Sequence, residues 1–414
     1  MSDDATLDDL AKVVEDRVRP AEAADAVDGV PARYVAAPSS TEETAELLRV
    51  AAQHRLAVVA RGSGTKQRWG RPPGGIDLVV ETTAMAGVVE HAAGDLICVV
   101  RAGTTMADLE ATLAHADQQL ALDAPFPSAT VGGTVATGTS GPRRLLYGTM
   151  RDLLIGITFV RADGVVAKAG GKVVKNVAGY DFGKLLTGSY GTLGVVTEVA
   201  LRLHPLPRTQ RFVSVETTER EGAAESARRV LGSQVVPSAV EIDQPADGAV
   251  TVTVLVEGIE AGGRARAEST QQLLGPDSVV GGAPDWFGSY PFADGDIGLK
   301  ITCTLAGVGP LLSVAHGLGE RHGIPVRVRG SAAGVLYAAI PGDTQPSDAA
   351  HLVEEIRSLA GTYHGGVVVL TAPEPARAAL DMWGPVPGLA LMRRLKDELD
   401  PDHRLAPGRF VGGI

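Results

Sequence analysis

The chain has 414 residues, of which 44% are hydrophobic and 21% charged, a balance typical of a soluble globular protein with two or three packed units. Its formal net charge of −11 argues against nucleic-acid binding and against a polybasic membrane patch. The two cysteines, Cys98 and Cys303, form no CxxC pair, so their spacing predicts neither a structural zinc nor an iron–sulfur cluster. We therefore expect no metal site and a reducing compartment.

The N-terminal residues 1–13 are acidic and amphipathic, and they lack the basic and apolar regions of a signal peptide. No uncharged apolar stretch reaches the ~20 residues that a membrane-spanning helix needs. We expect a cytoplasmic protein that reaches a membrane only through partner subunits.

In the first half, short apolar runs alternate with helical patterns and turns. Helices are predicted over residues 41–53, with Thr41 as the N-cap, and 105–116. Runs rich in β-branched residues predict strands over 56–60, 76–81, 96–101, 154–161, 165–169 and 193–203. Pro205 and Pro207 then mark a boundary.

The second half of the chain also combines predicted strands and helices, in a different order. Strands are predicted over residues 212–215, 239–242, 250–256, 297–305, 325–328, 333–340 and 365–370. Helices are predicted over 221–231, 261–274, 309–321, 347–361 and 389–399, with a loop over 275–292. This order predicts one antiparallel sheet backed by helices, so the fold class is α+β.

The segment Arg61-Gly62-Ser63-Gly64-Thr65 directly follows a predicted strand. Its glycines allow a tight turn whose backbone N–H groups converge on an anion such as a pyrophosphate. An ordinary Gly/Ser turn explains this segment equally well when it is taken alone. The third glycine of the dinucleotide-binding fingerprint is absent, because Gln67 occupies its place.

Two further segments, 127–142 and 185–197, consist mostly of glycine, hydroxyl residues and small apolar residues. Small side chains let the backbone approach a flat ligand, and hydroxyls can donate to phosphates. A low-complexity loop and a glycine-rich connector are the simpler alternatives for each segment alone.

Together, in this order, the three segments resemble the FAD-binding domain of the vanillyl-alcohol-oxidase (p-cresol methylhydroxylase type) family over residues 29–207. The stretches 140–144, 148–152, 175–181, 395–401 and 407–409 are similar to the E-type FAD-binding subunits of glycolate oxidases. The resemblance implies an extension (1–28), a two-subdomain FAD-binding domain (29–207), an α+β cap or substrate domain (208–375) and a C-terminal segment (376–414) that returns to the FAD domain.

The resemblance also implies which residues contact FAD. They are Arg61, Gly62, Ser63, Gly64, Thr65, Ser128, Gly132, Gly133, Thr137, Ser140, Gly141, Asp152, Gly188, Gly191, Gly194 and Val195. Some relatives carry a flavin-linking histidine where this chain has Thr65, so we expect FAD to be bound non-covalently.

Three departures weaken the case for independent catalysis. Tyr190 stands where related dehydrogenases usually carry a glutamate, and Ala406 where the tail often has asparagine. The cap histidines lack the tight spacing of a metal site; they are His316, His322, His351 and His364.

The catalytic residues are not identified by the sequence, and the candidates are few. An α-hydroxy acid needs a cation for its carboxylate. Arg143, Arg144, Arg151 and Lys175 could supply one, with Tyr180 as polar support near the flavin. For each arginine, phosphate neutralisation or a surface ion pair is the competing interpretation.

The resemblance implies a FAD-dependent oxidoreductase acting on CH–OH groups, as a subunit of a glycolate (2-hydroxy acid) oxidase or dehydrogenase. The implied partners are glycolate or D-lactate, a homologous FAD-containing catalytic subunit and an iron–sulfur subunit. Two alternatives stay open: a non-catalytic subunit that holds FAD as a relay or for structure, and a stand-alone flavoenzyme acting on another small alcohol or lactone.

Overall fold

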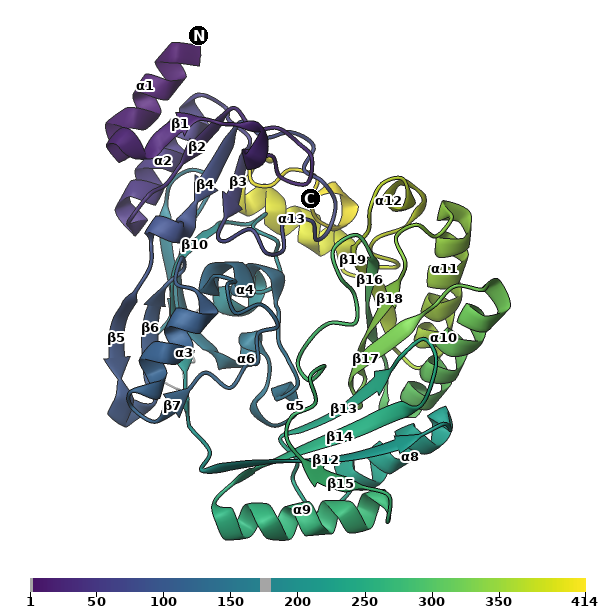
Figure 1. The fold of residues 1–414 in the computed structure, drawn as a ribbon. Coiled ribbons are helices and arrows are strands. Elements are labelled where there is room, and N and C mark those ends of the chain that lie inside the picture. Colours follow the sequence, from purple (N-terminus) through teal and green to yellow (C-terminus); the bar gives the residue numbers. More distant parts are fainter. Residues whose placement is uncertain (1–2, 172–179) are drawn as a thin grey trace. The chain divides into compact units, whose positions relative to one another are not determined.

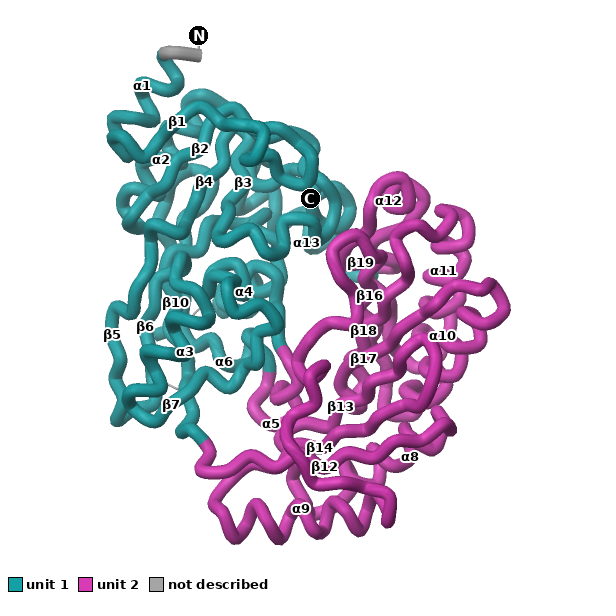
Figure 2. The backbone as a smooth tube through the Cα atoms, viewed as in Figure 1, with its two compact units in different colours: residues 1–140, 149–206, 386–414 teal, residues 141–148, 207–385 magenta. Residues whose placement is uncertain are grey.

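The fold is that of a computed structural model, which describes residues 3–171 and 180–414 (Figure 1). The chain forms two compact units (Figure 2). Unit 1 comprises residues 1–140, 149–206 and 386–414, and unit 2 comprises residues 141–148 and 207–385. The C-terminal segment thus returns to the unit that holds the glycine-rich segments, while the short piece 141–148 belongs to unit 2. The predicted domain limits at 28, 207 and 375 stay a prediction.

Unit 1 begins with a four-stranded sheet in the order β1-β2-β4-β3, in which β2, β4 and β3 run parallel. Its strands are β1 (Val18–Pro20), β2 (Tyr34–Ala36), β3 (Val58–Arg61) and β4 (Leu78–Glu81). Helices α1 (Asp3–Val14) and α2 (Thr41–Gln53) cover it, with Leu10, Leu47 and Leu48 in the shared core. The N-cap of α2 is Ser40, not Thr41 as predicted, because the Ser40 hydroxyl accepts from the Glu43 N–H at 3.1 Å.

The second part of unit 1 is an antiparallel five-stranded sheet in the order β5-β6-β10-β8-β9. Its strands are β5 (Val88–Ala92), β6 (Ile97–Arg101), β8 (Leu154–Val160), β9 (Val166–Gly170) and β10 (Val195–Arg202). The helices are α3 (Met106–Ala114), α4 (Val131–Thr137), α6 (Met150–Leu153), α7 (Phe182–Leu186) and α13 (Leu389–Leu399). β7 (Gln118–Gln119) pairs with β11 (His204–Pro205). Buried side chains from the sheet, α3, α4 and α6 form one core.

Helix α4 occupies the middle of the segment 127–142, where no helical periodicity is visible in the sequence. Thr130 starts this helix, since its hydroxyl accepts from the Gly133 N–H at 3.2 Å. The helix ends at Gly138, whose φ of +62° is in the left-handed region that favours glycine. Two glycines therefore lie inside a helix, where their missing side chains expose the backbone to close neighbours.

Unit 2 is one eight-stranded antiparallel sheet in the order β15-β12-β14-β13-β17-β18-β16-β19, which confirms the predicted antiparallel sheet. Its strands are β12 (Thr209–Thr217), β13 (Ala239–Gln244), β14 (Val250–Gly258), β15 (Val279–Gly281), β16 (Ile297–Thr302), β17 (Arg327–Ser331), β18 (Val335–Ile340) and β19 (Gly366–Thr371). β15 lies in the region predicted as loop. The helices are α5 (Arg144–Tyr147), α8 (Arg220–Leu231), α9 (Glu260–Leu274), α10 (Val308–His322), α11 (Pro346–Thr362) and α12 (Ala376–Ala379).

The two faces of this sheet differ in chemistry. On β14, Val250, Val252 and Val254 face the core that the long helices share with the sheet. Figure 1 shows helices α8, α10 and α11 beside this sheet. The alternating residues Leu255 and Glu257 are also buried, but they face the other way and meet polar partners or the small cluster around Phe287. The opposite face of the cap sheet is therefore buried and polar in part.

Within the described residues, no helix has both the length and the apolar composition that a membrane crossing requires.

Candidate functional site

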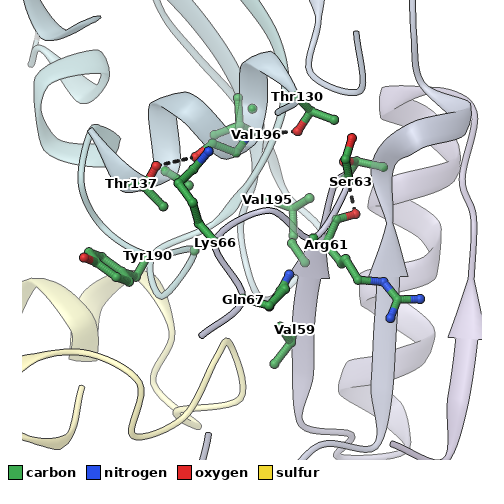
Figure 3. Close-up of a pocket in the computed structure, with 18 of the residues that line it drawn as sticks. Val59, Arg61, Ser63, Lys66, Gln67, Thr130, Thr137, Tyr190, Val195 and Val196 are labelled. Carbon is green, nitrogen blue, oxygen red and sulfur yellow. Dashed lines mark hydrogen bonds between the residues drawn. The ribbon is translucent and has the colours of Figure 1, made fainter. Parts of the chain in front are cut away.

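A pocket in unit 1 is lined by all three glycine-rich segments (Figure 3). The walls are the end of β3 with its following loop (59–67), the start and inner face of α4 (130–137) and residues 189–196. Thr82 and Arg409 complete the lining, and the pocket encloses roughly 800 Å³ of unfilled space, part of it open to solvent. Segments far apart in the sequence thus converge on one site.

Many predicted FAD contacts line this pocket. They are Arg61, Gly62, Ser63, Gly64, Thr65, Gly132, Gly133, Thr137, Gly191, Gly194 and Val195. Their assignment as FAD contacts stays a prediction, but the fold brings them together as the prediction requires.

The five other predicted contacts have different positions. Ser128 is exposed, and the buried Ser140 hydroxyl accepts from the Met150 N–H at 3.0 Å. Gly141 belongs to unit 2, and the Gly188 N–H donates to the Val135 carbonyl at 2.9 Å.

Asp152 is the fifth of these residues, and its carboxylate caps helix α6. It accepts from the Thr149 N–H at 2.8 Å and from the Thr149 hydroxyl at 2.7 Å. These hydrogen bonds hold the pKa of Asp152 below its usual value. Its observed role is local and structural.

The backbone explains why glycine is needed at the pocket. A Cβ at position 62 would overlap with the Thr130 hydroxyl, which caps α4. A Cβ at position 132 would lie 2.8 Å from the Ala102 side chain. The two glycines therefore allow the loop to approach Thr130 and allow α4 to approach Ala102 at the pocket wall.

Arg61 lines the pocket, but its guanidinium is engaged elsewhere. Its Nη2 lies 2.9 Å from the Asp25 carboxylate and 3.5 Å from that of Glu81. Figure 3 shows the guanidinium pointing away from the other labelled side chains. Arg19 and Arg61 together hold the pKa of Asp25 well below its usual range. The charge of Arg61 is thus balanced within the chain.

Sequence reasoning missed Lys66, Thr130, Tyr190 and Arg409 as lining residues. Thr130 carried a readable signal, because a threonine directly before a helix is a common N-cap whose hydroxyl accepts from the N–H three residues on. Lys66 directly follows the glycine loop in the sequence. Arg409 comes from the C-terminal segment, and its guanidinium donates to the Gln67 and Trp69 carbonyls at 2.8 and 2.9 Å.

Tyr190, at the position of the family's glutamate, has a left-handed backbone with a φ of +57°. Its ring lies 5.4 Å from that of Phe410, centroid to centroid, so the tail supports this wall of the pocket. Tyrosine thereby replaces a charged side chain with an aromatic one at the lining.

The charged side chains among the described lining residues are all basic. The described lining residues of the pocket include Arg61, Lys66 and Arg409 but no aspartate or glutamate. This contrasts with the chain as a whole, whose net charge is −11. The pocket thus favours an anionic ligand.

Two of the candidate arginines, Arg143 and Arg144, belong to unit 2 and contact side chains of its strands. The Arg143 guanidinium lies 3.4 Å from the Glu257 carboxylate, and Arg144 donates to the Tyr337 hydroxyl at 3.0 Å. The Tyr147 hydroxyl donates to Glu257 at 3.1 Å. Burial and the Glu257 charge raise the pKa of Tyr147 to about 12, so it stays protonated.

The remaining candidates give no support to a substrate site. Tyr180 is 88% exposed and Arg151 is exposed, while Lys175 lies outside the described residues. In the cap, His316 and His351 each pair with a glutamate one helical turn away, at 3.2 and 2.7 Å. Across residues 3–171 and 180–414, no group of three or more potential metal ligands is found.

Comparison with known proteins finds two family matches along the chain. Residues 32–170 match the FAD binding domain family, and residues 376–410 match the C-terminal domain of FAD linked oxidases. Two regions of the chain are thus similar to FAD-dependent oxidase families. The cofactor of the chain is FAD, and both matched regions contribute residues to the pocket.

Solved structures confirm the fold over nearly the whole chain. p-Cresol methylhydroxylase with substrate bound superposes with a TM-score of 0.77 at 14% identity, covering 98% of this chain and 96% of that one. An alkyldihydroxyacetonephosphate synthase gives 0.74 at 16% identity, covering 98% and 85%. The predicted p-cresol methylhydroxylase-type fold is confirmed.

Curated relatives match over a shorter length. The glycolate oxidase subunit GlcE of Escherichia coli is 33% identical over 57% of this chain and 65% of its own length. The subunit GlcD of Bacillus subtilis is 33% identical over 51% and 45%. A D-lactate dehydrogenase of Archaeoglobus fulgidus is 32% identical over 54% and 53%. The matches thus span about half to two thirds of these relatives.

The residues present fit FAD. Its pyrophosphate is anionic, and the lining residues that the structure describes include basic side chains but no acidic ones. Its rings are flat, and the pocket walls carry glycines such as Gly62 and Gly132, where a Cβ would overlap with neighbouring atoms.

Proposed function

We propose that this chain is the FAD-binding subunit of a 2-hydroxy acid oxidase or dehydrogenase complex that acts on glycolate or D-lactate. The observation that carries the proposal is the sequence similarity to two glycolate oxidase subunits and to a D-lactate dehydrogenase. Because those matches cover only part of each relative, the substrate is taken from their shared chemistry: all three names describe oxidation of a small 2-hydroxy acid.

In this proposal FAD, when bound, would supply the group that accepts two electrons as the C–H bond of the hydroxy acid is oxidised. The chain's own residues bind and orient the cofactor. The loop 62–65 lines the pocket and would hold the pyrophosphate through its backbone N–H groups, with Thr65 and Thr137 also in the lining. Binding is non-covalent because Thr65, at the position of the flavin-linking histidine, cannot form that link.

The proposal includes partner proteins, because electrons must leave the flavin. Cys98 is buried and Cys303 half-buried, and burial raises the pKa of both thiols to about 11. Neither thiol is suited to bind an iron–sulfur cluster in this chain. We infer a separate iron–sulfur subunit and a homologous FAD-containing subunit, in a cytoplasmic complex that could reach a membrane through those partners.

A second candidate function is a FAD subunit that relays electrons or has a structural role without oxidising substrate itself. The observation that favours it is the engagement of the candidate catalytic residues. Arg143 and Arg144 are bound to Glu257 and Tyr337, and Tyr180 faces solvent. A substrate carboxylate would have to compete for those arginines.

Anaerobic mixing of the purified, FAD-loaded chain with glycolate or D-lactate separates the two candidates. Loss of the oxidised-flavin absorption band with the chain alone would support hydride transfer in this subunit. A persistent oxidised spectrum that bleaches only after partner subunits are added would favour the relay. No bleaching with either substrate under any combination would contradict the proposed substrate class.

A further inference from the structure

Lys66 is a buried cation in the wall of the cofactor pocket. Its side chain is 8% exposed and it lines the pocket directly after the glycine loop (Figure 3). Its Nζ lies 3.2 Å from the Thr65 hydroxyl and 5.3 Å from the centroid of the Phe126 ring. Both contacts are with neutral groups.

No carboxylate within residues 3–171 and 180–414 lies within ion-pair distance of the Lys66 ammonium. Arg61 differs in this respect, because it pairs with Asp25. The Arg409 guanidinium donates to the carbonyls of Gln67 and Trp69. Lys66 is therefore a buried lining cation that no carboxylate among the described residues balances.

Burial of an unbalanced charge is costly. Loss of hydration without a compensating anion disfavours the ammonium form, and burial lowers the pKa of Lys66 to about 8. An anion that enters the pocket beside the ammonium would offset this cost.

We propose that the Lys66 ammonium is the counter-charge for an anionic group of bound FAD. The inference rests on FAD as the cofactor and deepens the proposed function by assigning a cofactor-positioning residue. The pocket provides the geometry: the side chain is buried, lines the site and has no acidic neighbour there.

FAD offers two anions of this kind: the pyrophosphate, and the flavin ring system once reduced. A lysine that pairs with the pyrophosphate stabilises all forms of the cofactor and also ADP, which carries the same pyrophosphate. A lysine that pairs with the reduced ring stabilises the reduced form over the oxidised one and raises the midpoint potential. These two sources predict different results.

The test compares the full chain with Lys66→Met, Lys66→Arg and Lys184→Met. Lys184 is an exposed lysine paired with Asp181, so its replacement controls for net charge alone. Binding of FAD and of ADP is measured by titration of the apoprotein, and the midpoint potential of bound FAD by spectroelectrochemistry. Far-UV circular dichroism confirms that each variant is folded.

We expect Lys66→Met to weaken FAD binding by about 10- to 100-fold, the usual effect of losing a hydrogen bond to a charged group, with Lys66→Arg restoring most of it. An equal loss for ADP assigns the partner to the pyrophosphate. Unchanged ADP binding with a lower potential, by about 30 mV for each tenfold preference, assigns it to the reduced ring.

Two results would overturn the inference, and they are distinguishable. Equal FAD affinity, ADP affinity and potential in the wild-type and Lys66→Met chains would remove the role of Lys66 alone. Failure of the wild-type chain to bind FAD would remove the cofactor assignment and the proposed function with it.

Discussion

Two buried lysines in unit 1 have opposite surroundings. Lys396 is 0% exposed, and its Nζ donates to the Asp400 carboxylate at 2.7 Å, to the Thr192 carbonyl at 2.8 Å and to the Leu405 carbonyl at 2.9 Å. Lys66 is nearly as buried, but the partners of its Nζ within residues 3–171 and 180–414 are the Thr65 hydroxyl and the Phe126 ring. The chain supplies a carboxylate and two carbonyls to Lys396, whereas we infer that a ligand supplies the anion for Lys66.

The two lysines illustrate two roles of a buried charge, one in holding the fold and one in binding a ligand. Lys396 and Asp400 are one helical turn apart at the end of α13, and the lysine reaches Thr192 next to the pocket wall. This pair fixes the C-terminal segment on unit 1 and so helps to place Arg409 in the pocket. A buried charge with partners holds the fold, whereas one without them marks a binding site.

Breaking the completed pair should have the strongest consequence. Lys396→Met leaves the Asp400 carboxylate buried without its cation, so the free energy of unfolding should fall by about 3–5 kcal/mol. Urea unfolding of the apoprotein measures this loss, with Lys184→Met as the exposed control. A double variant, Lys396→Met with Asp400→Asn, should recover part of the loss. An unchanged unfolding midpoint in Lys396→Met would remove the distinction between the two lysines.

A more moderate consequence depends on pH and concerns Lys66. Its pKa is about 8 in the folded apoprotein, against 10.5 for a freely exposed lysine. Between these values the unfolded chain binds more protons at this site, so the free energy of unfolding rises with pH. Relative to Lys66→Met, the wild-type apoprotein should gain up to about 3 kcal/mol between pH 8 and pH 10.5. Parallel pH profiles of the two proteins would contradict this.

The weakest consequence concerns the backbone of the pocket. In Gly62→Ala the new methyl group meets the Thr130 hydroxyl, which caps α4. Loss of that cap should lower the free energy of unfolding by about 1 kcal/mol and weaken FAD binding. Gly75→Ala is the matched control, since a Cβ there meets nothing within 4 Å. Equal stability and FAD affinity in both variants would show that the close approach is unimportant.

Most strands and long helices were predictable from periodicity, and the order of elements in unit 2 predicted its antiparallel sheet. Helix α4 was not, because glycines and hydroxyl residues hide the helical period and only the Thr130 cap reveals it. The assignment of residues 141–148 to unit 2 depends on contacts such as Arg144 with Tyr337, which are distant in sequence.

The candidate site was predictable to a similar extent. The glycine loop and the run 188–195 carry local backbone signals and were predicted together by resemblance. Arg409 reaches the pocket only because the tail returns to unit 1, and the isolation of Lys66 depends on the absence of an acidic neighbour among the described residues. Neither the return of the tail to unit 1 nor the lack of an acidic neighbour for Lys66 among the described residues can be predicted from residue spacing along the sequence.

The most direct test of the FAD site is a titration of the apoprotein with FAD, followed by the quenching of flavin fluorescence. We predict saturable binding of one FAD per chain, weakened in Lys66→Met and unchanged in Lys184→Met. Absence of saturable binding by the wild-type chain, or binding that neither Lys66→Met nor Gly62→Ala alters, would contradict the assignment of this basic, acid-free pocket as the FAD site.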